Sequence, residues 1–312
     1  MPGTVAVTGA TGFIGSHIVA HLTKLGWRVR LLTRRLPTGP ILAGSRFAAV
    51  IGSLGDADAL DELIRGCEAV VHCAGLIKAV RPADFFAINA AATGRLAAAA
   101  AALPRPPRFV LLSSLAARES HLSPYAASKR AAEGVVASRS GPWLAVRAPA
   151  IYGPGDRETL AYFRAVARGF APRPKLPNAR LSLIHVADLA EALAHAVERP
   201  PPASVYEIDD GREGGYGYDD MATAAGAAMG RIARSLAIPR IVMDGIAWMN
   251  GIGHALGGSV QILTPGKVAE IFHSDWTVHD RRLAAAIGLA ARYDLAGGFA
   301  DTVLWYRRHG WL

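Results

Sequence analysis

The chain has 312 residues, of which 51% are hydrophobic and 19% are charged. Such a chain can bury a large core, which excludes an intrinsically disordered protein. The net charge is +9, but the basic residues are scattered and no basic run carries interleaved aromatic residues, so we expect no nucleic-acid binding and leave contact with an anionic membrane surface open.

The two cysteines, Cys67 and Cys73, have no metal-ligand partners at a suitable spacing. We therefore expect neither a metal site nor a disulfide framework. The N-terminus lacks the basic segment of a signal peptide, and no window of about 20 residues is apolar and free of charge. These features predict a cytoplasmic protein without a membrane-spanning helix.

The first predicted elements are a buried strand, a glycine-rich turn and a helix. The strand leads into T-G-A-T-G-F-I-G, in which Gly9, Gly12 and Gly15 are spaced by three, and Ser16 to Leu25 follows as an amphipathic helix. Gly9 permits a tight turn, Gly12 lets the backbone approach a pyrophosphate, and Gly15 lets the helix pack on the strand. The helix N-terminus offers free N–H groups to phosphates. This context favours a dinucleotide site over an ordinary glycine-rich turn.

The second predicted strand, Arg28 to Thr33, bears on which dinucleotide binds. An acidic residue near the end of this strand would contact the ribose 2′-hydroxyl and favour NAD. The sequence has Arg34 and Arg35 there instead. Two cations suit a 2′-phosphate, so we expect NADP(H) to be preferred, with NAD(H) as the alternative.

The next elements continue to alternate between strand and helix. The predicted strands are Ala48–Ile51, Ala69–Cys73, Arg108–Leu112 and Trp143–Ala148, and the predicted helices are Asp58–Arg65, Arg81–Leu103 and Ser123–Arg139. This rhythm predicts an α/β fold with a Rossmann-type, doubly wound parallel sheet. His72, within an apolar strand, is expected to be a hydrogen-bonded core residue rather than a ligand.

The rhythm breaks after Pro149. The remaining predicted elements are a helix Glu158–Arg168, a Pro-rich loop Gly169–Asn178, a helix Ala187–Glu198, a strand Val205–Ile208 and a helix Asp219–Met229. We expect residues 1–150 to form the nucleotide-binding domain and residues 151–312 a smaller mixed substrate region. The two should interleave, with a strand near 180–184 and a helix near 187–198 returning to the nucleotide domain.

Tyr125 and Lys129 are four residues apart on one predicted helix, so they share a face. A phenol has a pKa of about 10, and a neighbouring ammonium is expected to lower it. A tyrosine tuned in this way can donate a proton to a carbonyl oxygen, or accept one from an alcohol. The spacing of Tyr125 and Lys129 alone is weak evidence for a catalytic pair. Ser113 and Ser114 precede the pair by one strand–helix unit, which strengthens that evidence.

Together, the spacing G-x-x-G-x-x-G, the stretch L-L-S-S-L-A-A and the stretch P-Y-A-A-S-K resemble the extended short-chain dehydrogenase/reductase superfamily, of the NAD-dependent epimerase/dehydratase type. The resemblance implies that Ser114 hydrogen-bonds the substrate oxygen, with Ser113 as the fallback. It implies that Lys129 also holds the cofactor ribose, and that Asn89 holds a proton-relay water rather than being a surface amide. His185 and Asp188, in S-L-I-H-V-A-D-L-A, are expected to be structural.

The residues and the resemblance together predict a set of cofactor contacts, in which Ser53 replaces the adenine-contacting Asp of the family. The set is Gly9, Thr11, Gly12, Phe13, Ile14, Gly15, Arg34, Arg35, Ser53, Leu54, Cys73, Ala74, Gly75, Lys129, Pro149, Ala150 and Ile151.

Only ten residues separate Ser114 from Tyr125. Sugar-nucleotide enzymes of this superfamily carry a longer insert there, so the short segment favours simple carbonyl/alcohol redox. The C-terminal third resembles the hydroxysteroid-dehydrogenase-like and complex I accessory-subunit-like groups. In this third, Pro239 to His254 is predicted to be an apolar helix. It could be part of the core, cover an apolar pocket or contact a membrane surface. Asp244 argues against insertion across a bilayer.

These observations favour an NADP(H)-dependent oxidoreductase that interconverts a ketone and a secondary alcohol on an apolar, lipid-like substrate, such as a 3-keto-lipid or a steroid-like compound. A nucleotide-sugar epimerase or dehydratase with bound NAD is the first alternative. A non-catalytic NADP-binding assembly module is the second. We expect a cytoplasmic monomer or homodimer, with a peripheral membrane contact left open.

Overall fold

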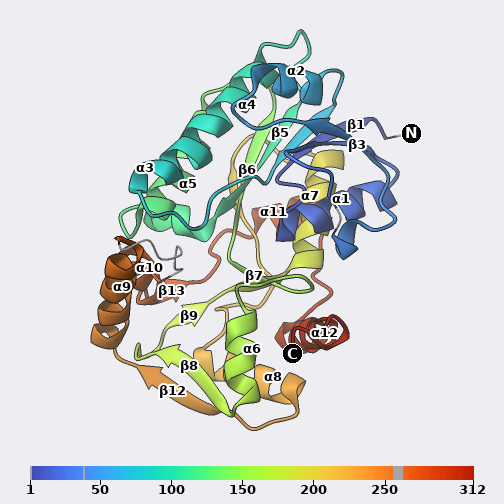
Figure 1. Cartoon of the computed structure of the whole chain (residues 1–312). Coiled ribbons are helices and arrows are strands. Elements are labelled where there is room, and N and C mark those ends of the chain that lie inside the picture. Colours follow the sequence, from blue (N-terminus) through green and yellow to red (C-terminus); the bar gives the residue numbers. More distant parts are fainter. Residues whose placement is uncertain (1, 38, 256–262) are drawn as a thin grey trace.

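The computed structural model describes residues 2–37, 39–255 and 263–312, with the side chains of 251–255 excepted. Its centre is a seven-stranded parallel sheet (Figure 1). From one edge to the other, the strands are β11 (Val205–Glu207), β6 (Trp143–Ala148), β5 (Arg108–Ser114), β4 (Ala69–His72), β1 (Thr4–Thr8), β2 (Arg28–Thr33) and β3 (Phe47–Ile51). The strand order reverses between β1 and β4, where open α/β sheets form a ligand crevice at the carboxyl ends of their strands. The predicted α/β Rossmann-type fold is confirmed.

Helices cover both faces of the sheet. One face packs against α1 (Phe13–Lys24), α7 (Val186–Glu198) and α11 (Arg282–Ile287), and the other against α2 (Ala57–Ile64), α4 (Ala92–Ala101) and α5 (Pro124–Ala137). In β1, Val5 and Val7 join the first core and Ala6 joins the second. A strand that is buried on both faces has to be apolar throughout, which explains the continuous V-A-V run.

A smaller mixed region lies below the sheet in the view of Figure 1. Its elements are β7 (Ala150–Tyr152), α6 (Leu160–Ala167), β8 (Phe170–Pro174), β9 (Arg180–Leu181), β10 (Leu183–His185), α8 (Tyr218–Met229), β12 (Arg234–Ile238), α9 (Arg240–Ala255), α10 (Pro265–Ile271), β13 (Asp275–Trp276) and α12 (Leu295–Arg308). Aromatic side chains form its core, where the Phe163 and Phe299 rings meet edge to face with 5.0 Å between their centres. From this part of the chain, α7 returns to pack on α1 and β11 returns to pair with β6.

Three segments differ from the sequence-based expectation. The helix expected over Arg81–Leu103 divides into α3 (Pro82–Phe85), a π-helix η2 (Phe86–Ala91) and α4. The Pro-rich stretch expected as a loop contains β8, which pairs with β12 in a two-stranded sheet. Each strand of such a sheet has a free edge, so prolines without an N–H group are tolerated. The strand expected near 180–184 consists of β9 and β10, which pair with β13 and β7 outside the central sheet.

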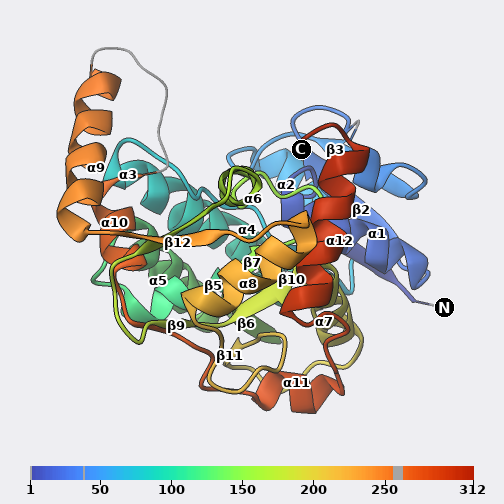
Figure 2. The ribbon, with the colours of Figure 1, turned by 90° about the horizontal axis from the view of Figure 1, so that it is seen from below.

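The remaining short elements are two 3₁₀ helices, η1 (Pro40–Leu42) and η3 (Leu115–Glu119). Figure 2 shows α9 projecting from the edge of the molecule, beside α10. Across the described residues, none of the helices is both long and apolar enough to cross a bilayer.

Candidate active site

A cleft of about 1050 Å³ opens at the carboxyl ends of β1, β2 and β4. Ten of the predicted cofactor residues line it: Gly9, Thr11, Gly12, Phe13, Ile14, Gly15, Arg34, Arg35, Cys73 and Gly75. The other predicted contacts, Ser53, Leu54, Ala74, Lys129, Pro149, Ala150 and Ile151, lie outside this lining.

The glycine turn at the base of the cleft leaves no room for side chains. Gly9 has a φ of +72°, and a Cβ there would lie 2.6 Å from the backbone N of Ala74. A Cβ on Gly15 would overlap with the carbonyl oxygen of Gly9. Gly12 caps α1, whose first N–H groups point along the helix axis into the cleft. The cradle therefore fits a dinucleotide pyrophosphate at a helix N-terminus.

The opposite wall of the cleft comes from the C-terminal part of the chain. Residues 155–158, Trp305 and Trp311 line it. The guanidinium of Arg157 lies 4.9 Å from the centre of the Trp311 ring. Across the opening, Lys78 Nζ and Glu158 Oε1 form an ion pair at 2.6 Å. Sequence analysis missed this wall because no local motif connects segments that are so far apart in the chain.

Tyr125 lies in the first turn of α5, where Ser123 is the N-cap and Pro124 the first residue. The Ser123 Oγ accepts from the backbone N of Ala126 at 3.0 Å. The Phe85 ring lies edge-on to Tyr125, with 6.0 Å between ring centres. The Ser114 hydroxyl, at the end of β5, interacts with the phenol and acts to lower its pKa. The structure therefore brings Ser114 and Tyr125 together.

The pKa of Tyr125 differs from the expectation that Lys129 would lower it. Desolvation by burial raises this pKa to about 12, the Ser114 hydrogen bond opposes the rise, and the negative charge of Glu270 adds to it. The Lys129 ammonium instead donates to the carbonyl oxygen of Leu112 at 2.6 Å. Burial lowers the pKa of Lys129 to about 8, against the influence of Cys73 and Glu133. The phenol thus keeps its proton at neutral pH.

Asn89 is buried within the π-helix η2 and is not a surface amide. Its Nδ2 donates to the Leu76 carbonyl oxygen and to Ser128 Oγ, both at 2.9 Å, and its Oδ1 accepts from the Leu76 N at 2.6 Å. A Cβ on Gly75 would lie 3.2 Å from this Oδ1 and 3.9 Å from Lys129 Nζ. The amide therefore fixes the loop after β4 next to the Lys129 ammonium. π-Helical turns are frequent at functional sites.

Ser113 points away from Ser114 into a buried polar network. Its Oγ donates to Glu133 Oε1 at 2.6 Å, and Arg147 donates to both oxygens of the same carboxylate, at 2.8 and 2.7 Å. The fallback serine is thus held in a buried ion pair, which leaves Ser114 as the hydroxyl beside Tyr125.

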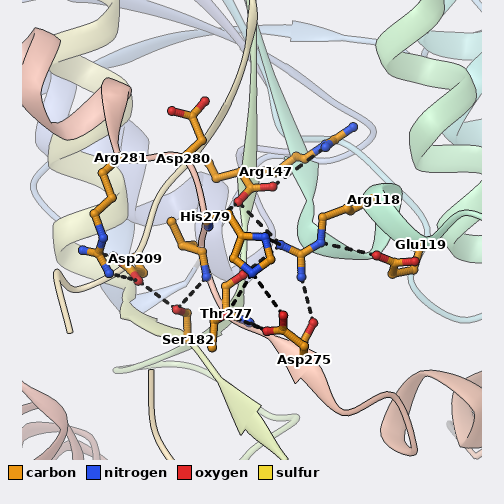
Figure 3. Close-up of polar contacts among 12 residues, drawn as sticks. Arg118, Glu119, Arg147, Ser182, Asp209, Asp275, Thr277, His279, Asp280 and Arg281 are labelled. Carbon is orange, nitrogen blue, oxygen red and sulfur yellow. Dashed lines mark hydrogen bonds and ion pairs between the residues drawn. The ribbon is translucent and has the colours of Figure 1, made fainter. Parts of the chain in front are cut away.

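The network continues to the C-terminal segment (Figure 3). Arg147 lies 3.9 Å from Glu207, and Arg118 donates to the carbonyl oxygens of Asp275 and Thr277, each at 2.8 Å. These bonds attach β13 and the residues that follow it to η3, directly after Ser114.

His72 and His185, the two histidines considered in the sequence analysis, make structural contacts. His72 is completely buried between Thr8 and Thr93, whose hydroxyls lie 2.6 and 2.8 Å from its ring nitrogens. Burial lowers its pKa to about 3. His185 caps α7 and stacks on Tyr293 with 3.9 Å between ring centres. The buried Asp188 accepts from the backbone N of Tyr293 at 3.1 Å. These contacts agree with the expected core and structural roles.

Comparison with known proteins identifies the family. The sequence model of the NAD dependent epimerase/dehydratase family matches residues 5–208. A ceramide reductase of Caulobacter vibrioides is 41% identical over 314 residues, which cover 99% of this chain and 96% of the relative. The chain belongs to the NAD-dependent epimerase/dehydratase family of extended short-chain dehydrogenases/reductases. It is therefore an NAD(P)-dependent oxidoreductase with a nicotinamide dinucleotide as its cofactor.

Two further proteins are similar to this chain. A 4-hydroxy-2-methyl-3-oxo-4-farnesyl-3,4-dihydroquinoline-1-oxide ketoreductase of Stigmatella aurantiaca is 30% identical over 226 residues, which cover 66% of this enzyme and 67% of the relative. Among solved structures, MoeE5 in complex with UDP-glucuronic acid and NAD superposes with a TM-score of 0.72. The match covers 99% of this chain and all of MoeE5, at 24% identity, and it supports the fold alone.

Proposed function

We propose that this enzyme is an NADP(H)-dependent reductase that interconverts a ketone and a secondary alcohol on an apolar, lipid-like substrate, such as a 3-keto-lipid or a steroid-like compound. The observation that carries the proposal is the full-length similarity to a ceramide reductase. The juxtaposition of Ser114 with a protonated Tyr125 supports it, because reduction of a ketone needs an acid beside the carbonyl oxygen.

In this proposal the chain's own residues hold the ketone and move one proton. The Ser114 hydroxyl and the Tyr125 phenol donate hydrogen bonds to the carbonyl oxygen, and Tyr125 transfers its proton as negative charge develops there. The bound nicotinamide dinucleotide supplies the hydride. The Lys129 ammonium, with a pKa of about 8, holds the ribose. Asn89 keeps the neighbouring loop in place, and its Oδ1 retains a lone pair for a relay water.

The first test measures NADPH oxidation in the presence of 3-keto-lipids and, in a separate assay, in the presence of UDP-sugars. We expect turnover of the keto-lipids only. Tyr125→Phe should lower kcat by about 10²- to 10⁴-fold, because it removes the acid, while NADPH affinity stays the same. Tyr218→Phe, on α8, is the matched control and should be unchanged. Equal kcat in the Tyr125→Phe variant would rule out the proposed mechanism.

Preference for NADP(H) is supported by Arg34 and Arg35, which are exposed and line the cleft just after β2. Fluorescence titration should give tighter binding of NADPH than of NADH. Arg34→Ala/Arg35→Ala should weaken NADPH binding at least about tenfold, since two contacts to a phosphate are lost, and leave NADH binding unchanged. Arg28→Ala, at the other end of the same strand, is the control. A preference for NADH would contradict the proposal.

A nucleotide-sugar epimerase or dehydratase is the second candidate, because the fold also matches MoeE5 with its UDP-sugar. The segment between Ser114 and Tyr125 has ten residues, of which the first five form η3. This short length counts against a sugar-nucleotide site. If purified protein carries NAD that does not exchange and consumes no added NADPH, this candidate takes first place. The third candidate, a non-catalytic assembly module, predicts that Tyr125→Phe leaves cellular function intact.

We also propose a cytoplasmic protein, a monomer or a homodimer through the helices near 81–102 and 123–139, with a peripheral membrane contact. Light scattering tests the oligomeric state.

A further inference from the structure

Helix α9 presents large apolar side chains to solvent. Within its first eleven residues, Ile241 is 80% exposed, Trp248 68% and Met249 63%, and Val242 and Ile246 are also exposed. Monomeric proteins rarely expose a contiguous apolar face of this kind unless it binds something.

The exposed residues form one continuous face of the helix. At 100° per residue, Ile241, Val242, Ile246, Trp248 and Met249 fall within an arc of about 160°. The opposite side faces the protein: Ala247 is 2% exposed, and Asn250 Nδ2 donates to the carbonyl oxygen of Leu263 at 3.1 Å. In Figure 2, α9 stands out from the edge of the molecule with α10 at its base. The apolar face is therefore turned outward by the packing of the helix.

Two cations, Lys175 and Arg240, lie at the start of this helix. Lys175 is exposed, and its backbone N donates to Ile238 at 2.8 Å, two residues before α9 begins. Arg240 opens the helix, whereas the exposed Arg231 and Arg234 lie before or at the far end of β12, the strand that leads to it. Within the apolar stretch the single acidic residue, Asp244, is paired with Arg240 at 3.5 Å. With Lys175, Arg240 and Asp244 counted together, the start of the helix is thus net positive, in a chain with a net charge of +9.

We propose that the α9 face, defined by Ile241, Val242, Ile246, Trp248 and Met249, docks onto the surface of an anionic lipid bilayer. The helix lies in the interface with its apolar face among the acyl chains, while the flanking cations contact anionic headgroups. A tryptophan on such a face is well placed at the headgroup boundary. A second copy of the chain is disfavoured as the occupant, because the same cations would face each other across a symmetric contact.

Helix α10 connects α9 to the candidate active site. Helix α10 packs on α9 and also contacts the start of the helix that carries Tyr125, where a Cβ on Gly266 would lie 2.9 Å from Ser123 Cβ. Docking would therefore bring the site close to the bilayer in which an apolar ketone is dissolved. This last step rests on the proposed function, whereas the docking itself does not.

The test is co-sedimentation of the full chain with vesicles of equimolar phosphatidylglycerol and phosphatidylcholine, with pure phosphatidylcholine vesicles for comparison. We expect binding to the anionic vesicles that weakens with added salt. Ile241→Ser/Trp248→Ser should lower the partition coefficient at least about tenfold. The control Ile51→Ser/Leu304→Ser removes two exposed apolar side chains elsewhere and should bind like the wild type. Unchanged NADPH affinity shows that each variant is folded.

A second measurement does not depend on a disruptive variant. Brominated lipids should quench the fluorescence of Trp248 in the bound wild type, and Trp248→Phe should remain bound but lose that quenching. Absence of binding by the wild type, or binding that survives the double substitution, overturns the proposal. So does a dimer that the double substitution dissociates without any vesicle binding. Failure of ketone reduction alone would overturn only the proposed function.

Discussion

At the residue scale, the carboxylate of Glu270 acts on the protonation of Tyr125 from a different helix. Glu270 is buried, accepts a hydrogen bond from the Ser123 hydroxyl at the start of α5, and pairs with Lys267 Nζ at 2.9 Å. Its negative charge raises the pKa of Tyr125, two residues from Ser123. A high pKa keeps the phenol protonated, which favours proton donation, and therefore reduction, at neutral pH.

Removing this charge should move the pH profile in a defined direction. Glu270→Gln keeps an acceptor for Ser123 but removes the negative charge, so the pKa of Tyr125 should fall. Alcohol oxidation needs the phenolate and rises with pH through this pKa, so its rising limb should move to lower pH. Each unit of that shift corresponds to about tenfold more phenolate at a fixed pH below the pKa.

The partner of Glu270 supplies a control with the opposite sign. Lys267→Met leaves the negative charge without its counter-ion, so the pKa of Tyr125 should rise and the oxidation limb should move to higher pH. The measurement is the pH dependence of kcat/KM for alcohol oxidation in the three proteins. Limbs that coincide, or that shift in the same direction, would contradict an electrostatic role for Glu270.

At the scale of the element, the π-helix η2 turns the Asn89 side chain into the protein. There its amide pairs with the backbone N–H and C=O groups of Leu76, which have no partner in a strand or helix. Asn89→Ala would leave a partly buried N–H and C=O group of Leu76 unpaired. We expect the free energy of unfolding to fall by about 1–3 kcal/mol, measured by urea denaturation, together with a lower kcat.

The control for Asn89→Ala is a side-chain hydrogen bond that solvent can replace. Thr223 donates to the Asp219 carbonyl oxygen on an exposed part of α8, so Thr223→Ala should change the free energy of unfolding by less than about 0.5 kcal/mol. Equal effects of the two substitutions would show that Asn89 does not fix the loop.

The strands and helices of the central sheet could be predicted from the sequence because each has a strong local pattern. The apolar runs of β1 and β4 and the glycine turn are such patterns, and they define the cleft. The division of the helix at Phe86 could not be predicted, since an Ala-rich stretch has the same composition in α- and π-helical form. Strand β8 was missed because its pairing with β12 is a contact between distant segments that overrides the low strand propensity of proline.

The candidate site shows the same limit. The spacing of Tyr125 and Lys129 and the position of Ser114 could be predicted because they lie within or beside one helix. The pKa of Tyr125 could not, because it depends on burial and on Glu270, which is contributed by a segment more than a hundred residues further along the chain. Glu158 and Trp311 were missed in the cleft for the same reason.

At the scale of the whole molecule, a polar network with a buried centre joins the central sheet to the C-terminal region. Glu133 of α5, Arg147 of β6 and Glu207 of β11 form its centre, and Arg118 extends it to the segment around Asp275 and His279 (Figure 3). It passes through Ser113, the neighbour of Ser114. The network thus joins β6 and β11 at the edge of the sheet, the 3₁₀ helix η3 and the C-terminal segment.

Arg147 is the cation on which the centre of this network depends. Arg147→Met should lower the free energy of unfolding by about 3–5 kcal/mol, because it removes both hydrogen bonds of the guanidinium to the buried Glu133 carboxylate, while Glu207 keeps Arg118. Arg81→Met removes an ion pair of similar length, 2.7 Å to Asp84, but on an exposed side chain, and should cost less than about 1 kcal/mol. Urea denaturation of the two variants measures the difference.

Arg147→Met can destabilise the protein in two ways: it removes the attraction between Arg147 and Glu133, and it leaves the Glu133 charge buried without compensation. A double substitution separates these two effects. If the charge on Glu133 causes most of the loss, Glu133→Gln/Arg147→Met should be more stable than Arg147→Met alone, although it lacks one more charged group. Additive losses would mean that each side chain contributes through separate packing contacts. A gain in stability on the second substitution would show that charge compensation at this point holds the sheet and the C-terminal segment together.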